Sequence, residues 1–211
     1  MAFRTCCKLV IQSTTQAQPL VGSWVTSGNL SSPTSQPYTV TLGAMASGSG
    51  WPDAAGIFVV GDMIQMQCPN LNNAEPMRIS AIPSPNQLTF GPGTGAGIST
   101  YSNTAIQNPV AVNYHVNGGF GVGAWVSLLL DVNSIYVQPE DGNSGQWLYI
   151  GNSPSMTATY RRIKKLTKVA SNAQPNDWIT PAVVGNPWRT SELWILGTAV
   201  GDGYTVSFVI E

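Results

Sequence analysis

Short segments with strand-like patterns, each bounded by turn-forming residues, constrain the fold of this chain most. In Tyr38–Leu42 polar and apolar residues alternate, as in a half-buried strand. Segments of four to six residues follow at 63–68, 77–82 and 87–90, with Pro, Asn or Gly between them. No window shows a sustained helical period, and 22 glycines and 15 prolines supply many turns. The sequence therefore predicts an all-β protein: one or two small β-sandwich or barrel modules with long Gly/Ser/Pro-rich connections and an extended N-terminal segment.

Changes in composition along the chain predict three parts. We expect residues 1–37 to form an N-terminal strand and an extended polar arm, 38–107 a small β module, and 108–211 a C-terminal β-sandwich module. The arm, residues 13–37, is polar and nearly uncharged, with few apolar anchors. We expect it to be mobile in the isolated protein and ordered in an assembly, where an extended peptide can pair with a neighbour's sheet edge.

One hairpin is predicted in the C-terminal half. The strand-like segments 134–138 and 146–150 flank a turn at 139–145 that contains glycines, which adopt positive φ without strain. This pattern predicts a β-hairpin. At most one short helical turn is expected in the chain, at 160–166.

The scarcity of charge indicates a subunit of an assembly. Only 9 basic and 10 acidic residues occur among 211, and the net charge is −1, whereas about a quarter of the residues of an ordinary soluble domain are charged. A free monomer is kept soluble by a mixed, abundant surface charge, while a surface that packs against neighbours is depleted of it. The alternative is a monomeric secreted β-domain with an uncharged polar surface.

Two groups of residues are candidates for interfaces. Five of the nine basic residues lie in one short stretch: Arg161, Arg162, Lys164, Lys165 and Lys168. This run is expected to contact an acidic neighbouring subunit; a solvated strand edge is the second reading, and nucleic-acid binding is the least favoured.

Three tryptophans in loop-like segments, Trp24, Trp51 and Trp188, are the other group, because Trp is enriched at interface hot spots. A glycan-binding surface is the alternative reading of these rings. Trp147 and Trp194, within predicted strands, are expected in the core.

No catalytic, cofactor or metal motif is apparent, so we expect a non-enzymatic protein without cofactors. The chain has one histidine, His115, and lacks a Gly-x-Ser-x-Gly elbow, a phosphate-binding glycine loop and a Cys-x-x-Cys pair. No apolar stretch is long enough to cross a membrane or to serve as a signal peptide.

Three segments of the C-terminal half carry a family resemblance. Residues 131–137 (DVNSIYV), 147–152 (WLYIGN) and 191–208 (SELWILGTAVGDGYTVSF) resemble phrases of small β-sandwich modules in tailed-bacteriophage virion proteins, in which the last segment is a closing hairpin. The resemblance implies a virion component made in the host cytoplasm, and most directly a capsid decoration (cement) protein that bridges major capsid subunits. A tail, collar or baseplate component and a carbohydrate-binding host-attachment module are the alternatives. The implied partners are the major capsid protein or other virion subunits and further copies of the chain, with a glycan possible only in the last reading.

The cysteines are predicted to be reduced. An odd number, with Cys6 and Cys7 adjacent and Cys68 distant, does not form a disulfide framework. Denatured protein is expected to release three thiols to Ellman's reagent, and reductant is expected to leave its stability unchanged. A lower count would show a bridge between Cys68 and one of the other two.

Overall fold

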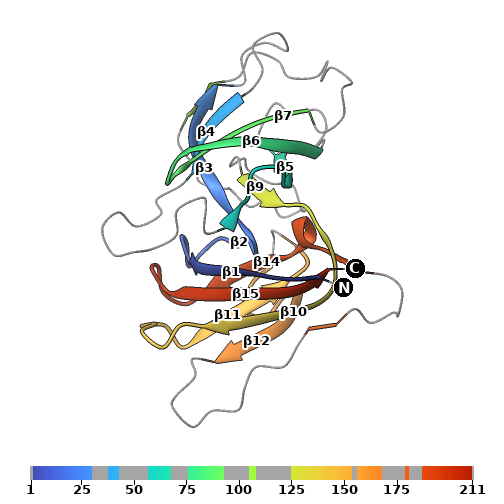
Figure 1. Cartoon of the computed structure of the whole chain (residues 1–211). Coiled ribbons are helices and arrows are strands. Elements are labelled where there is room, and N and C mark those ends of the chain that lie inside the picture. The colour runs from blue at the N-terminus through green and yellow to red at the C-terminus, as the bar shows by residue number, and fades with distance from the viewer. Residues whose placement is uncertain are drawn as a thin grey trace. The chain divides into compact units, whose positions relative to one another are not determined.

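The computed structural model describes residues 2–29, 38–42, 57–67, 76–92, 105–107, 125–153, 156–167, 179–180 and 187–210. The elements in these ranges are β-strands in antiparallel sheets and one short 3-10 turn, which confirms the predicted all-β class (Figure 1). The chain forms two compact units. Unit 1 holds the described residues up to Val21 and from Leu130 onwards, and unit 2 holds those from Gly22 to Leu129.

The two units do not follow the predicted parts 1–37, 38–107 and 108–211. The N-terminal strand belongs to the same sheet as the C-terminal strand, because their residues pair antiparallel from Ala2↔Ile210 to Val10↔Gly203. Unit 2 is therefore inserted in the sequence of unit 1. Local composition carries no signal for such pairing between the chain ends.

Unit 1 contains two four-stranded sheets, in the orders β1-β15-β10-β13 and β12-β11-β14-β2. Its elements are β1 (Ala2–Val10), β2 (Gln18–Pro19), β10 (Asp131–Pro139), β11 (Trp147–Gly151), β12 (Arg162–Thr167), β13 (Trp188–Arg189), η1 (Thr190–Glu192), β14 (Trp194–Gly197) and β15 (Gly203–Ile210). The segment 160–166, where a helical turn was expected, is mostly strand β12.

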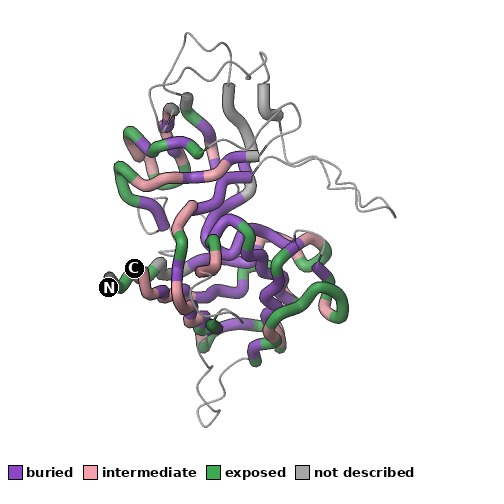
Figure 2. Tube along the Cα trace, turned by 90° about the vertical axis from the view of Figure 1, so that its right-hand side faces the viewer, coloured by how far each residue is buried: buried purple, intermediate pink, exposed green. Residues whose placement is uncertain are grey.

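The core of unit 1 joins its two sheets. In β15, Tyr204, Val206 and Phe208 are fully buried with less buried residues between them, the period of two seen along several strands in Figure 2. The Tyr204 hydroxyl donates a hydrogen bond to the Leu20 carbonyl, which follows β2 of the other sheet (3.1 Å). A Cβ on Gly197 of β14 would lie 2.6 Å from Ile11 Cγ1, so glycine permits close packing between the layers here.

The predicted hairpin at 134–150 is wrong, and so is the closing hairpin implied for 191–208. Strands β10 and β11 lie in different sheets, and so do β14 and β15, so each connection is an arch from one sheet to the other. The connection from β1 to β2 is a third arch. The segments are strands as expected, but each pairs with a strand distant in sequence rather than with its neighbour.

Two buried polar side chains, Asn143 and Asp202, fasten the arches together. Asn143 donates from Nδ2 to the Gly203 carbonyl (2.8 Å) and accepts from the Gly203 N–H (2.6 Å). The Asp202 carboxylate accepts from the Ser144 N–H (2.8 Å) and the Gly145 N–H (2.9 Å). A Cβ on Gly145 would collide with the Asp202 carboxylate, so this position requires glycine. The Asp202 carbonyl also accepts from the Ile11 N–H of the β1–β2 arch (2.8 Å). We call these contacts the arch network.

Residues 13–29 are the part of the predicted polar arm that the structure describes, and this part is folded. Ala17 and Gln18 are buried, and Leu20 and Val21 have no exposed surface. Gln18 Nε2 donates to the Val10 carbonyl (2.7 Å), which satisfies a polar side chain in the core. A few apolar residues and one hydrogen-bonded glutamine are therefore enough to bury part of this stretch within unit 1, and the mobility expected for the arm stays a prediction. Residues 30–37 lie outside the described residues.

Unit 2 contains one seven-stranded sheet in the order β4-β7-β6-β5-β9-β3-β8, with an additional pairing between β3 and β4 that curls the sheet back on itself. Its strands are β3 (Gly22–Asn29), β4 (Tyr38–Leu42), β5 (Met63–Gln67), β6 (Pro76–Ser84), β7 (Gln87–Pro92), β8 (Ala105–Gln107) and β9 (Trp125–Leu128). The strands predicted at 38–42, 63–68, 77–82 and 87–90 are confirmed over their described residues, and β5, β6 and β7 pair in sequence order.

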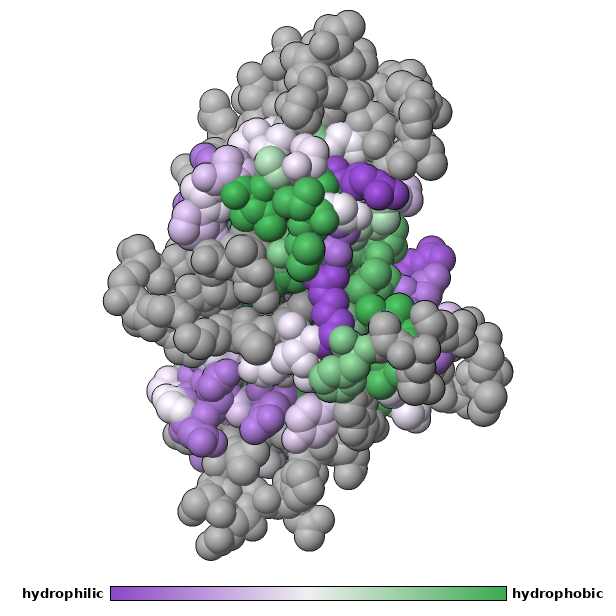
Figure 3. Space-filling model, viewed as in Figure 1, coloured by the Kyte–Doolittle hydropathy of each residue, from purple (hydrophilic) through white to green (hydrophobic). Residues whose placement is uncertain are grey.

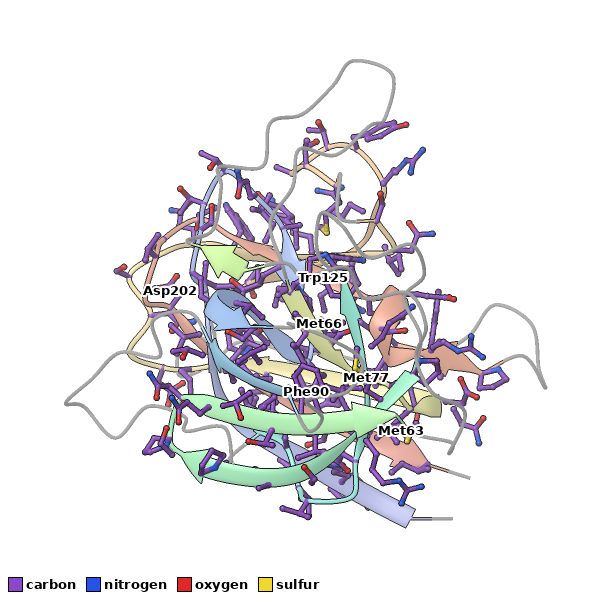
Figure 4. The ribbon with its side chains drawn as sticks, turned by 90° about the horizontal axis from the view of Figure 1, so that it is seen from above. Met63, Met66, Met77, Phe90, Trp125 and Asp202 are labelled. Atoms are coloured by element: carbon purple, nitrogen blue, oxygen red, sulfur yellow. The ribbon has the colours of Figure 1, made fainter. Side chains whose placement is uncertain are left out.

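Aliphatic, aromatic and thioether side chains fill the core of unit 2. Met66, Met77 and Phe90 have no exposed surface, and Trp125 is 8% exposed; Figure 4 shows these residues on β5, β6, β7 and β9. Methionine is flexible enough to fill irregular space between such rings.

A tight turn projects two valines from unit 2. Val59 and Val60 are 58% and 57% exposed and precede Gly61, whose φ is +99°. The Asp62 carboxylate accepts from the Val59 N–H (2.7 Å), and the Asp62 N–H donates back to the Val59 carbonyl (3.0 Å). Apolar side chains also reach the surface on the face shown in Figure 3.

Candidate interaction surface on strand β12

Four of the five clustered basic residues lie on or beside one edge strand. Arg162, Lys164 and Lys165 belong to β12, and Arg161 immediately precedes it. Among the described strands, β12 stands at the end of its sheet order and pairs with β11 alone. Lys168 lies outside the described residues. The structure therefore places the basic run at a sheet edge, as its solvated-edge and docking readings both require.

Strand β12 is interrupted by a bulge. Lys164 pairs with Ile150 and Arg162 pairs with Gly151, so Ile163 has no partner residue on β11. A bulge re-aims the flanking side chains and, together with charges, hinders pairing with a further strand. Because the register shifts at Ile163, Arg162 lies opposite Gly151 and Lys165 lies opposite Tyr149.

Three cations of this edge lie over aromatic rings. Lys165 Nζ is 3.4 Å from the centre of the Trp147 ring. The Arg162 guanidinium lies 5.8 Å from the Tyr149 ring centre, and that of Arg161 lies 5.3 Å from Tyr160. Such cation–π contacts contribute about 0.5–1 kcal/mol at exposed sites and hold a long side chain in one position. We call Trp147, Tyr149, Tyr160, Arg161, Arg162 and Lys165 the cation–aromatic surface.

The loop that precedes β12 is held by several local hydrogen bonds. Thr157 Oγ1 accepts from the Tyr160 N–H (3.0 Å), and the Thr157 N–H donates to the Tyr160 carbonyl (3.0 Å). Arg161 has a φ of +54°, a left-handed conformation that is uncommon for a residue with a side chain. A Cβ on Gly151 would collide with the Arg161 carbonyl, so the strand beneath must have glycine there. The chain therefore maintains an unfavourable backbone conformation at the residue that begins the basic edge.

Hydrogen bonds also orient the two guanidinium groups. Arg161 Nη1 donates to Ser153 Oγ (3.2 Å), and Arg162 Nη1 donates to the Ala158 carbonyl (2.9 Å). Arg161, Arg162 and Lys165 form no ion pair with a described carboxylate. Elsewhere in the described residues, Arg189 forms an ion pair with Asp131 (3.3 Å). Both arginines and Lys165 are exposed. The charge of the surface is thus oriented by neutral groups and is not neutralised by a described carboxylate.

Lys164 differs from its neighbours. It pairs with Ile150, whose side chain is buried in the core, and it is only partly exposed. The sequence placed all five basic residues in one set, whereas strand alternation separates Lys164 from Lys165, and the bulge at Ile163 places Arg162 on the same face as Lys165.

The candidate tryptophans are not brought together with the basic edge. Trp188 lies in β13, opposite Val132, and is partly buried; its indole nitrogen is buried without a hydrogen-bond partner in the described part of the chain. Trp24 lies in β3 opposite Trp125 rather than in a loop. Trp51 and His115 lie outside the described residues. The role of these tryptophans at an interface stays a prediction.

The two tryptophans predicted to lie in the core differ. Trp194 is 3% exposed, which confirms the prediction, but Trp147 is only partly buried and carries Lys165 on its ring. The sequence analysis missed Trp147, Tyr149 and Tyr160 as partners of the cations. The alternation Trp147-Leu148-Tyr149 was a usable signal, because it places both rings on one face of a strand.

The described residues contain no group of three or more His, Cys, Asp or Glu side chains placed to hold a metal ion. In the same ranges no helix is long and apolar enough to cross a membrane. Comparisons of the chain with protein-family models, with curated proteins and with solved structures give no match.

Proposed function

We propose that this chain is a non-enzymatic structural subunit of a tailed-phage virion, and specifically a capsid decoration protein that binds major capsid subunits. The observation that carries the proposal is the position of its charge. The chain has only nine basic residues, and four of them lie together at the edge strand β12 or directly before it. Such a cluster of like charges can orient an acidic partner electrostatically.

The two-unit organisation supports a bridging role. Each unit has its own core, and the resemblance to virion modules falls on β10, β11, β14 and β15, the strands of the two packed sheets of unit 1. One chain with two separate units offers two surfaces, so a single subunit can contact two neighbours. Burial of apolar surface, at about 25 cal/mol per Å² less the cost of association, would supply the affinity.

A glycan-binding role receives less support. A sugar ring needs an accessible aromatic face. Of the three tryptophans named for this role, Trp188 is partly buried in β13 and Trp51 lies outside the described residues. On the surface beside β12, the Trp147 ring carries Lys165 and Tyr149 is 8% exposed. A tail, collar or baseplate position uses the same kind of protein contact as a capsid position, so the two are separated by where the protein lies on the particle.

Imaging of particles tests the proposal. Virions from the strain that encodes the chain are expected to contain it by mass spectrometry, and electron cryomicroscopy of deletion particles is expected to show density lost from the capsid surface. Adding back purified protein should restore that density. Density lost from the tail would favour the alternative position, and particles that never contain the chain would overturn the proposal.

A further inference from the structure

The cations of the cation–aromatic surface are prepared for a partner. Each of Arg161, Arg162 and Lys165 lies over a different ring, and both arginines are also hydrogen-bonded to neutral oxygens. Side chains that are already ordered lose less conformational entropy on binding. Arginine retains further N–H donors beyond the one that each uses here, in a planar arrangement that matches a carboxylate.

We propose that the cation–aromatic surface docks onto a carboxylate-rich surface of a neighbouring protein subunit. Arg161, Arg162 and Lys165 make the contacts, Tyr160 and Ile163 add exposed apolar area beside them (54% and 37% exposed), and Lys164 is outside the contact. The inference deepens the proposed function and rests on it in taking the partner to be a protein subunit.

The contact is made by side chains rather than by addition of a strand. Strand β12 is at the edge of its sheet, which is where an extended peptide would pair. The bulge at Ile163 and the adjacent positive charges hinder such pairing. The exposed cations lie on this protected edge. Attraction between charges and contact between apolar side chains therefore hold the acidic partner, in place of backbone hydrogen bonds to an added strand.

The state of the rings favours an acidic protein over a nucleic acid. Binding of single-stranded nucleic acid uses open aromatic faces on which bases stack, whereas Trp147 and Tyr160 each have a cation over the ring and Tyr149 is nearly buried. Because the net charge of the chain is −1, attraction of either kind of polyanion depends on the local charge of this surface.

The test uses fluorescein-labelled poly-L-glutamate as the acidic probe, with fluorescence anisotropy as the readout. The full chain is expected to bind the probe at low salt, and the affinity is expected to fall as salt shortens the Debye length from about 30 Å at 0.01 M to about 3 Å at 1 M. The double variant R162E/K165E is expected to bind at least about tenfold more weakly, because reversing two contact charges removes attraction and adds repulsion.

Matched controls separate this surface from general charge. Arg78→Glu reverses an exposed arginine on β6 in unit 2 and is expected to leave the affinity within about twofold. Tyr149→Phe keeps the ring under Arg162 and is expected to do the same, whereas Trp147→Ala removes the ring under Lys165 and is expected to weaken binding about two- to fivefold. Circular dichroism and thermal melting check that each variant is folded.

Four outcomes would overturn the inference. The first two are absence of poly-L-glutamate binding by the unmodified chain, and equal weakening of that binding by R78E and by R162E/K165E. The third is tighter binding of oligo(dT) of the same net charge, which would assign the surface to nucleic acid. The fourth is an oligomer of the chain alone that R162E/K165E dissociates in sedimentation velocity, which would assign the surface to a second copy. None of these requires virions, so failure here is distinguishable from failure of the particle-imaging test.

Discussion

Replacing Asp202 by alanine is expected to destabilise unit 1 by about 3 kcal/mol. Its carboxylate is 3% exposed and accepts from the backbone N–H groups of Ser144 and Gly145. A hydrogen bond to a charged group contributes about 1.5–3 kcal/mol, and the two bonds to Asp202 are part-buried. The alanine would also remove the connection between the arch of β10–β11 and that of β14–β15. Thermal unfolding followed by circular dichroism measures the effect, which is expected to lower the melting temperature by on the order of 10 °C.

Asp141→Ala is the matched control, because Asp141 lies in the same arch but is exposed. Its effect is expected to stay within about 0.5 kcal/mol, as for other surface substitutions. Gly145→Ala is a second variant of the same network: its new Cβ would meet the Asp202 carboxylate and Thr198 Oγ1, so it is expected to destabilise unit 1 although it removes no hydrogen-bonding group. Equal melting temperatures for D202A and D141A would contradict the structural role of Asp202.

Replacing Phe90 by alanine is expected to cost about 3–5 kcal/mol in unit 2, because a fully buried ring is replaced by a cavity. The cavity lies in a core that also contains Met66 and Met77, and movement of these flexible side chains would reduce the cost toward the lower limit. Hydrogen exchange with mass spectrometry is the appropriate measurement, since it reports each unit separately. Peptides from β4, β6 and β7 are expected to lose protection first, because β7 pairs with both of the other two.

Phe3→Ala makes the same chemical change at a residue that is 64% exposed in β1 and is expected to have little effect. Loss of protection in the peptides of unit 2 after the Phe3 substitution, or its absence after the Phe90 substitution, would be incompatible with the described core.

Much of the candidate surface was accessible from sequence. The cluster of basic residues from Arg161 to Lys168 stands out in a chain with nine basic residues, and both docking and a strand edge were expected readings. The rings beneath these cations were not predicted, because Trp147 and Tyr149 are more than ten positions away and meet Lys165 and Arg162 only through the pairing of β11 with β12. Nor did the sequence distinguish Lys164, whose different position follows from the bulge at Ile163.

Local patterns were sufficient to predict which segments are strands. Apolar alternation and flanking turn residues identified most of β4, β6, β7, β10, β11, β14 and β15, because a strand's period of two is a property of its own side chains. The same patterns failed for residues 13–29, which lack a clear alternation. There burial depends on contacts such as that of Leu20 with Tyr204, which no local window contains.

The sequence by itself determined the all-β class and most strand positions, and only the tertiary structure decided how the strands pair. A turn with glycines between two alternating segments is compatible with a hairpin, whose strands pair with each other, and with an arch, whose strands lie in different sheets. Both reverse the direction of the chain. The outcome depends on partners distant in sequence: β15 pairs with β1, and β11 pairs with β14. Buried polar groups then stabilise the arches, because Asn143 and Asp202 find their hydrogen-bonding partners only when the two arches lie against each other.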